Sequence, residues 1–174
     1  MKVIILIVAS QGYQPMEYGI PKKVFEQSGV KVITASNKSG QAIAKDGSKT
    51  NVDITIDKIN PKNYDGIFLI GGPGALDNLD NELVYSKMKE AAAANKVFGA
   101  ICISPRILAS AGLLKNKKAT GWDDDGELAQ VFKKYGVIKT NQDVVVDGNI
   151  ITATGPRAAE QFAQAILNAL KNKG

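Results

Sequence analysis

The sequence predicts a single α/β domain built around a mostly parallel β-sheet. Short apolar runs alternate with segments of helical periodicity along the chain, which is the pattern of repeated strand–helix–strand units. Several helical segments end at a glycine, the usual C-terminal stop. With 174 residues, of which 44% are hydrophobic and 22% charged, the chain has the size and composition of one globular unit. We therefore expect residues 1–174 to form one domain.

The first half of the chain alternates strands and helices. In order, we expect a strand over 3–8, a helix over 16–28, a strand over 30–35, a short strand pair over 43–45 and 52–56, a strand over 66–70 and a helix over 82–95. The wholly apolar strands suit a parallel sheet that is covered on both faces. Gly29 ends the first helix, and Asp46-Gly47 forms the turn of the strand pair.

The second half continues the alternation. In order, we expect a strand over 97–101, helices over 104–111 and 124–135, a hairpin over 144–147 and 149–152, and a last helix over 156–170. Gly112 and Gly136 end the first two helices. Gly148 after an Asp, between apolar runs, is a strong hairpin signal, and Pro156 suits the first turn of a helix.

The composition excludes several classes of function. The net charge is only +5, and the lysines are scattered without interleaved aromatics, so we expect no nucleic-acid site. The chain has no His and one Cys, which argues against a zinc site and excludes any Cys–His or Ser–His pair. The Asp123-Asp124-Asp125 run is interpreted as the start of a helix rather than a metal site. We expect neither a metal nor a cofactor.

The location is predicted from the same features. The apolar run over 3–8 is interpreted as a buried strand and not as a signal peptide, because no small-residue cleavage site follows it. No apolar stretch reaches the roughly 18 residues of a membrane span. A single Cys excludes an intramolecular disulfide. We therefore expect a cytoplasmic protein that makes no membrane contact.

Cys102 is the strongest candidate for a chemically active residue. It stands where the buried strand over 97–101 meets a helix, with Ala100 two residues before it and Ser104 two residues after it. Small residues on both sides are the steric requirement of a nucleophile elbow, a strained strand-to-helix turn that exposes its central residue. Backbone N–H groups at the helix start would favour the thiolate and lower the pKa of the thiol. The alternative is a small buried hydrophobe.

Glu17 is the candidate proton partner of this thiol, since no His is available. It lies just beyond the carboxyl end of the first strand, and the carboxyl ends of parallel strands line the crevice where ligands bind. The Gly71-Gly72-Pro73-Gly74 loop reaches the same edge and could present amide groups to an oxyanion. A Glu in a first helical turn is also a routine partner of the helix dipole, and a glycine loop can simply turn the chain.

Taken together, these segments resemble the ThiJ/PfpI superfamily, which contains the Parkinson's-disease-associated deglycase, glyoxalase-type relatives and archaeal intracellular proteases. The resemblance covers nearly the whole chain. It is carried by Pro15-Met16-Glu17, Phe68-Leu69-Ile70-Gly71-Gly72, Ala100-Ile101-Cys102, Ala111-Gly112-Leu113-Leu114 and Thr154-Gly155-Pro156. It implies a flavodoxin-like three-layer sandwich, with helices on both faces of the sheet, that is usually dimeric. It also implies that Cys102 is the nucleophile, that Glu17 hydrogen-bonds its sulfur, and that the amides of Gly72 and Ile103 form an anion pocket.

The chain departs from the family pattern where a His is expected. The protease-like members place His directly after the Cys, where this chain has Ile103. The deglycase branch places a His after a Lys-x-Thr segment, and here Trp122 or Gly121 stands at that position. A peptidase mechanism that needs imidazole is therefore not expected. Trp122 is a candidate substrate-binding residue, although packing is the commoner role of such a ring.

Two classes of function remain from the sequence. The first is a cysteine-dependent enzyme, of the glyoxalase or deglycase type, that acts on a small reactive carbonyl compound through Cys102 and Glu17. The second is a stress-response or redox-sensing protein in which an oxidant converts Cys102 to sulfenic or sulfinic acid without turnover. The partner is thus a small electrophile or an oxidant. A flavin-binding module is disfavoured, because residues 10–13 lack the hydroxyl-rich loop that grips a flavin phosphate.

Overall fold

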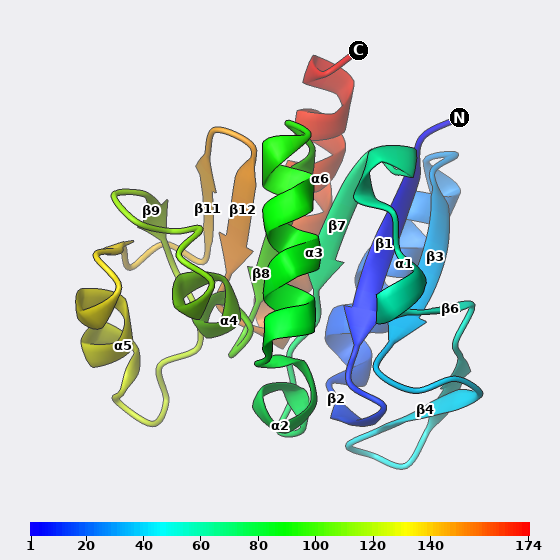
Figure 1. The fold of residues 1–174 in the computed structure, drawn as a ribbon, viewed down its shortest axis with the longest axis horizontal. Coiled ribbons are helices and arrows are strands. Elements are labelled where there is room, and N and C mark those ends of the chain that lie inside the picture. The colour runs from blue at the N-terminus through cyan, green and yellow to red at the C-terminus, as the bar shows by residue number, and fades with distance from the viewer.

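A seven-stranded sheet forms the centre of the molecule in a computed structural model that describes all residues 1–174 (Figure 1). In spatial order its strands are β11 (Val144–Asp147), β12 (Ile150–Ala153), β8 (Val97–Ile101), β7 (Gly66–Leu69), β1 (Val3–Val8), β3 (Lys31–Ser36) and β6 (Ile54–Thr55). All neighbours are parallel except β11 and β12, which form the predicted hairpin. The carboxyl ends of six strands therefore meet at one edge of the sheet.

Helices cover both faces of this sheet. The helices are α1 (Pro15–Gln27), α2 (Ala75–Leu79), α3 (Glu82–Ala93), α4 (Pro105–Ser110), α5 (Leu128–Lys134) and α6 (Ala159–Asn172). In Figure 1, α3 crosses in front of the sheet and α6 lies behind it. Alternate side chains of β1 enter two separate cores: Leu6 packs with residues of α1 and α6, and Ile7 packs with residues of α3, α4 and α5. The predicted three-layer α/β sandwich is confirmed.

Two small sheets and three single 3-10 turns complete the chain. One sheet holds β2 (Gln11–Tyr13), β4 (Gln41–Ala44) and β5 (Lys49–Asn51), and the other pairs β9 (Lys118–Ala119) with β10 (Ile138–Lys139). The 3-10 turns are η1 (Ile56–Lys58), η2 (Pro61–Asn63) and η3 (Pro156–Ala158). Strand β2 directly precedes α1, and its pairing with β4 holds the residues after β4 close to the start of that helix.

Two predicted elements differ from the observed ones. The predicted pairing of a strand over 52–56 with the strand over 43–45 is wrong. The partner of β4 is β5, which lies before residue 52, whereas β6, within 52–56, pairs with β3 in the large sheet. The chain changes sheets at Asp53, whose Oδ2 accepts the Thr34 N–H at 2.8 Å and whose own N–H donates to the Thr34 carbonyl at 2.9 Å. The helix predicted over 124–135 begins only at Leu128, because the acidic residues before it are used in tertiary contacts.

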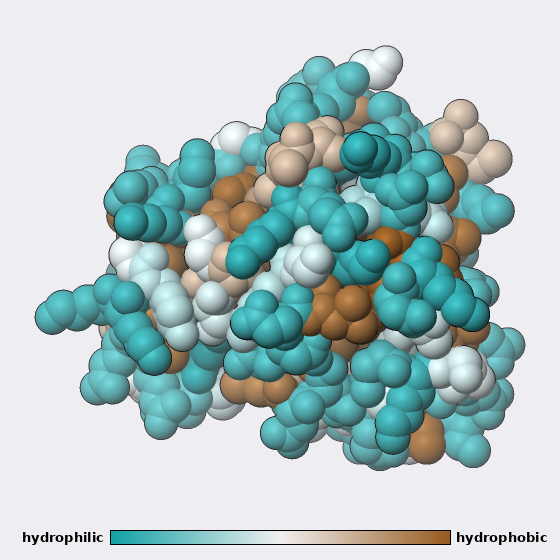
Figure 2. Space-filling view, viewed as in Figure 1, coloured by the Kyte–Doolittle hydropathy of each residue, from teal (hydrophilic) through white to brown (hydrophobic).

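The run predicted to be a buried strand over 3–8 is β1, and Ile4 to Val8 are fully buried in the middle of the sheet. None of the helices is both long and apolar enough to cross a membrane. Figure 2 shows that the face over α3 and α4 is mainly hydrophilic, with smaller apolar patches between the polar side chains.

Candidate active site

Cys102 lies in the turn between β8 and α4, at the carboxyl edge of the sheet. Its φ is +68°, a left-handed conformation that costs a non-glycine residue roughly 1–2 kcal/mol. Backbone bonds on both sides hold it there: its N–H donates to Ala153 at 2.9 Å, and its carbonyl accepts the Trp122 N–H at 2.7 Å. The buried Ser104 hydroxyl donates to the Ile70 carbonyl at 2.7 Å. The strained torsion expected of a nucleophile elbow is confirmed.

Glu17 approaches this turn from the first turn of α1. Its side chain is fully buried, and its Oε1 accepts the Gly71 N–H at 3.0 Å, while Oε2 has no hydrogen-bond partner. Gly71 lies directly between the two candidate residues: a Cβ at this position would stand 2.6 Å from both the Cys102 Cβ and Glu17 Oε1. The absence of a side chain at Gly71 thus allows the carboxyl group to reach the thiol.

The amides of Gly72 and Ile103 act on the sulfur as hydrogen-bond donors, and both lower the pKa of Cys102. Gly72 has a φ of +121°, and a Cβ there would lie 2.5 Å from both the Gln14 nitrogen and the Gly12 oxygen. Only glycine therefore brings this amide to the site. The two amides are placed where they could stabilise a negative charge beside Cys102, as the resemblance implied.

The protonation of the pair differs from the expected lowering of the thiol pKa. Burial raises the pKa of Glu17 to about 7, against the opposing effects of its hydrogen bonds and of Lys45. Burial and the charge of ionised Glu17 raise the pKa of Cys102 to about 12, because two negative charges side by side in a buried site repel each other. The amides of Gly72 and Ile103 and the six-residue α4 do not outweigh these effects. The pair therefore carries one negative charge from about pH 7 upward.

This shift predicts that the protein loses stability as the pH rises from 5 to 8. The pKa of Glu17 is about 7 in the folded protein and close to its ordinary value of 4.5 in the unfolded chain, so its stabilising contribution is full below pH 4.5 and disappears as pH rises through 7. The expected decrease in the free energy of unfolding between pH 5 and pH 8 is about 2.5 kcal/mol. Urea denaturation at several pH values measures it, and Glu17→Gln should abolish the slope.

A flat dependence of stability on pH would contradict the raised pKa of Glu17. The carboxylates with lowered pKa values (Asp46, Asp57 and Asp125) are already ionised across this pH range and contribute no slope. If the wild-type protein keeps the same stability from pH 5 to 8, the Glu17 carboxyl is not held protonated by burial.

A pocket of about 830 Å³ opens above the sulfur. Four of the five predicted site residues line it, namely Gly72, Cys102, Ile103 and Trp122, and Glu17 lies buried beneath. The pocket wall also contains Asp124, which was predicted to begin a helix, and two cations that the sequence analysis did not single out, Lys45 and Arg157. Lys45 and Arg157 follow strands β4 and β12 directly or closely, so their place after a strand was the signal that could have identified them.

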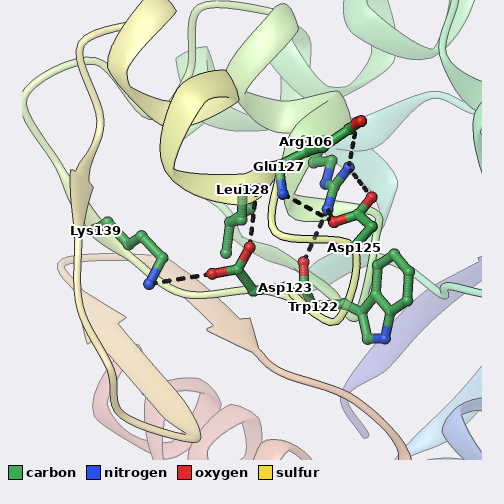
Figure 3. Close-up of polar contacts among 7 residues, drawn as sticks. All are labelled: Arg106, Trp122, Asp123, Asp125, Glu127, Leu128 and Lys139. Atoms are coloured by element: carbon green, nitrogen blue, oxygen red, sulfur yellow. Dashed lines mark hydrogen bonds and ion pairs between the residues drawn. The ribbon is translucent and has the colours of Figure 1, made fainter.

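Trp122 is held at the pocket by Arg106, a buried residue of α4. Arg106 forms a bidentate pair with Asp125 (3.0 and 2.7 Å), donates to the Trp122 carbonyl at 3.0 Å, and lies 5.6 Å from the centre of the Trp122 ring. Glu127 is a more distant ion-pair partner at 3.9 Å. Figure 3 shows Arg106 at the centre of these contacts, with Asp123 turned instead to Lys139 and to the Leu128 N–H. The late start of α5 follows from these contacts.

Loss of the Asp125 carboxylate should loosen the Trp122 wall. Asp125→Asn removes the carboxylate that holds the Arg106 guanidinium in its bidentate pair. Because Arg106 in turn contacts Trp122, the indole ring should become more accessible to acrylamide, which fluorescence quenching measures. Trp122 is the only Trp in the chain, which makes the signal specific. Asp124→Asn is the matched control, because the Asp124 side chain forms no ion pair. Equal quenching in both variants would show that Arg106 does not position the ring.

The structure places no group of three or more His, Cys, Asp or Glu side chains where they could hold a metal ion. In the acidic run at 123–125, Asp125 pairs with Arg106 and Asp123 accepts the Leu128 N–H.

Comparison with known proteins gives a consistent set of relatives. Residues 1–169 match the model of the DJ-1/PfpI family. An uncharacterized protein of Methanocaldococcus jannaschii is 38% identical over 97% of this chain and 82% of its own length. The deglycase PfpI of Pyrococcus furiosus is 30% identical over 96% of this chain and 99% of its own length. The crystal structure of a ThiJ/PfpI domain protein from Brachyspira murdochii matches with a TM-score of 0.92 at 28% identity, covering 98% of this chain and 96% of that one.

Proposed function

Because this chain belongs to the DJ-1/PfpI family, we propose that it is a cysteine-dependent enzyme acting on small reactive carbonyl compounds, of the glyoxalase or deglycase type. Cys102 is the nucleophile and Glu17 its proton partner. The observation that carries the proposal is the buried Glu17 carboxyl, whose Oε2 has no hydrogen-bond partner, beside a lone cysteine in a strained turn that faces a pocket. Relatives from Pyrococcus furiosus and Thermococcus kodakarensis, each 30% identical, are named deglycases.

The protonation state of the pair suggests how the reaction begins. Near neutral pH the charge rests on Glu17 and the thiol is protonated, so the carboxylate removes the thiol proton as sulfur attacks the carbonyl carbon. A base with a pKa of about 7 is well matched to this task. The carbonyl oxygen gains the negative charge, and the amides of Gly72 and Ile103 stabilise it.

Glu17 then takes the role that imidazole has in many cysteine enzymes. Once protonated, it can return its proton to the oxygen, and the carboxylate regenerated in that step can accept a proton from carbon in a glyoxalase-type rearrangement. The hydrogen bond from the Gly71 amide to Oε1 helps to hold the carboxyl group in place beside Cys102. A peptidase reaction is not proposed, because this chain has no His to supply the imidazole that takes the proton of the nucleophile and then gives it to the leaving amine.

The proposal is tested by following the loss of methylglyoxal in the presence of the protein. We expect repeated turnover by the wild type, rising as pH passes through 7 because Glu17 must be ionised. Cys102→Ser should show none, since a hydroxyl beside a carboxylate is a very poor nucleophile. Aldehyde loss that stops at one equivalent, or that persists in Cys102→Ser, would overturn the proposal.

A redox-sensing role is the second candidate. It is supported by the half-exposed position of Cys102 and by two amide donors that could bind the oxygens of a sulfinate. One relative of known structure, 25% identical with a TM-score of 0.86, is an oxidized DJ-1 from Toxoplasma gondii. Stoichiometric oxidation of Cys102 by dilute hydrogen peroxide, seen by mass spectrometry in a protein without aldehyde turnover, would favour this role.

A further inference from the structure

Two cations line the mouth of the Cys102 pocket. Lys45 follows β4 directly, and its N–H donates to the Tyr13 carbonyl at 2.9 Å, which fixes its backbone beside the start of α1. Arg157 is in the η3 turn, two residues after Gly155, where a Cβ would lie 4.0 Å from Glu17 Oε2. Both backbones are thus fixed close to the reactive pair, and both side chains are exposed.

Neither side chain is used elsewhere in the protein. Lys45 and Arg157 form no ion pair and no side-chain hydrogen bond. Asp46 is the neighbour of Lys45, but its Oδ1 accepts the Ser48 N–H at 2.9 Å and the Ser48 hydroxyl at 2.6 Å. The two positive charges therefore remain free to act on a molecule in the pocket.

The charge of Lys45 reaches the reaction centre. It lowers the pKa of Glu17, although burial dominates and raises it. The residues that line the pocket include two cations, Lys45 and Arg157, and one acidic side chain, Asp124. Glu17 lies buried beneath and is not part of this lining. A neutral dicarbonyl would gain nothing from this arrangement, whereas an anionic one would be attracted and oriented by it.

We infer that the preferred substrate is a dicarbonyl compound that also carries a carboxylate, and that glyoxylate, an aldehyde with a neighbouring carboxylate, binds at the same place and serves as a probe. This inference rests on the proposed function and adds the class of substrate. The carboxylate lies between Lys45 and Arg157, and the carbonyl carbon faces Cys102. In the addition step the S–C bond forms, the thiol proton passes to Glu17, and the carbonyl π electrons become the alkoxide lone pair beside the Gly72 and Ile103 amides.

The test uses two alkylating reagents that differ mainly in charge. Iodoacetate carries a carboxylate and iodoacetamide is neutral, and Cys102 is the only thiol in the chain. The ratio of their rate constants reports the preference of the pocket for an anion without requiring turnover. In the Lys45→Gln/Arg157→Gln double variant, we expect this ratio to fall about tenfold, or roughly threefold for each exposed cation. Salt should reduce the wild-type ratio in the same direction.

The control is Lys38→Gln/Lys171→Gln, which removes two exposed lysines that do not line the pocket. It leaves the same net charge as the pocket variant and should keep the wild-type ratio. An unchanged ratio in the pocket variant, or an equal fall in the control, would overturn the inference. If the ratio falls as expected but methylglyoxal is not turned over, the anion site stands and the proposed catalysis fails. If methylglyoxal is turned over and the ratio does not change, only the inference fails.

Competition gives an independent measurement. Glyoxylate should protect Cys102 from iodoacetamide at a concentration about tenfold lower than glyoxal does, and this advantage should disappear in the Lys45→Gln/Arg157→Gln variant. Equal protection by the two compounds in the wild type would contradict the preference for a carboxylate.

Discussion

Replacing Glu17 by Gln should lower aldehyde turnover about a hundredfold while leaving Cys102 open to alkylation. Gln can still accept the Gly71 N–H through its amide oxygen, so the position of the side chain is preserved. It cannot take a proton from the thiol or return one to the product. Steady-state kinetics with methylglyoxal measure the loss, and iodoacetamide labelling confirms that the thiol remains accessible.

The labelling rate of this variant also identifies where the charge of the pair rests. In the wild type, ionised Glu17 contributes to raising the pKa of Cys102. Removal of that charge should lower the pKa of the thiol, so Glu17→Gln should react at least as fast as the wild type at pH 8. Slower labelling would mean that Glu17 is a protonated donor that stabilises a thiolate, and would contradict the ionised carboxylate beside a protonated thiol.

Substituting Gly71 by Ala should destabilise the protein by about 3 kcal/mol and abolish turnover. The added Cβ would lie 2.6 Å from the Cys102 Cβ, 2.6 Å from Glu17 Oε1 and 2.8 Å from the Ile101 carbonyl. Overpacking of a buried site costs roughly 1–3 kcal/mol, and here the neighbours include backbone that cannot move aside. Urea denaturation measures the change in stability, and the methylglyoxal assay measures the activity.

Gly19→Ala is the matched control for this substitution. Gly19 is an exposed residue of α1, the helix that carries Glu17, and a Cβ there would meet nothing within 4 Å. Alanine favours a helix over glycine, so the control should be stabilised by about 0.5–1 kcal/mol with full activity. If Gly71→Ala is as stable and as active as the control, the site does not require the close approach of the Glu17 carboxyl to Cys102 that Gly71 allows.

The sequence alone determined the features that depend on neighbouring residues in the chain. The buried strands β1 and β8 were predicted with the bounds that the structure has, because an uninterrupted apolar run has one stable place in a covered parallel sheet. The strained turn at Cys102 was predictable because the small residues that permit it lie within two positions of it. Glu17 was brought to the same edge by the rule that parallel strands end together.

Only the tertiary structure decided the charge of the site and the residues around it. The pKa of Cys102 is raised, not lowered, because burial and a carboxyl group from a distant segment act on the thiol through space. The Arg106 pair delays the start of α5, and it places Trp122 on the pocket wall. Lys45 and Arg157 lie at the pocket mouth by the same packing of separate elements. Local pattern specifies backbone conformation, whereas electrostatic energies depend on distances and burial that exist only after the chain has folded.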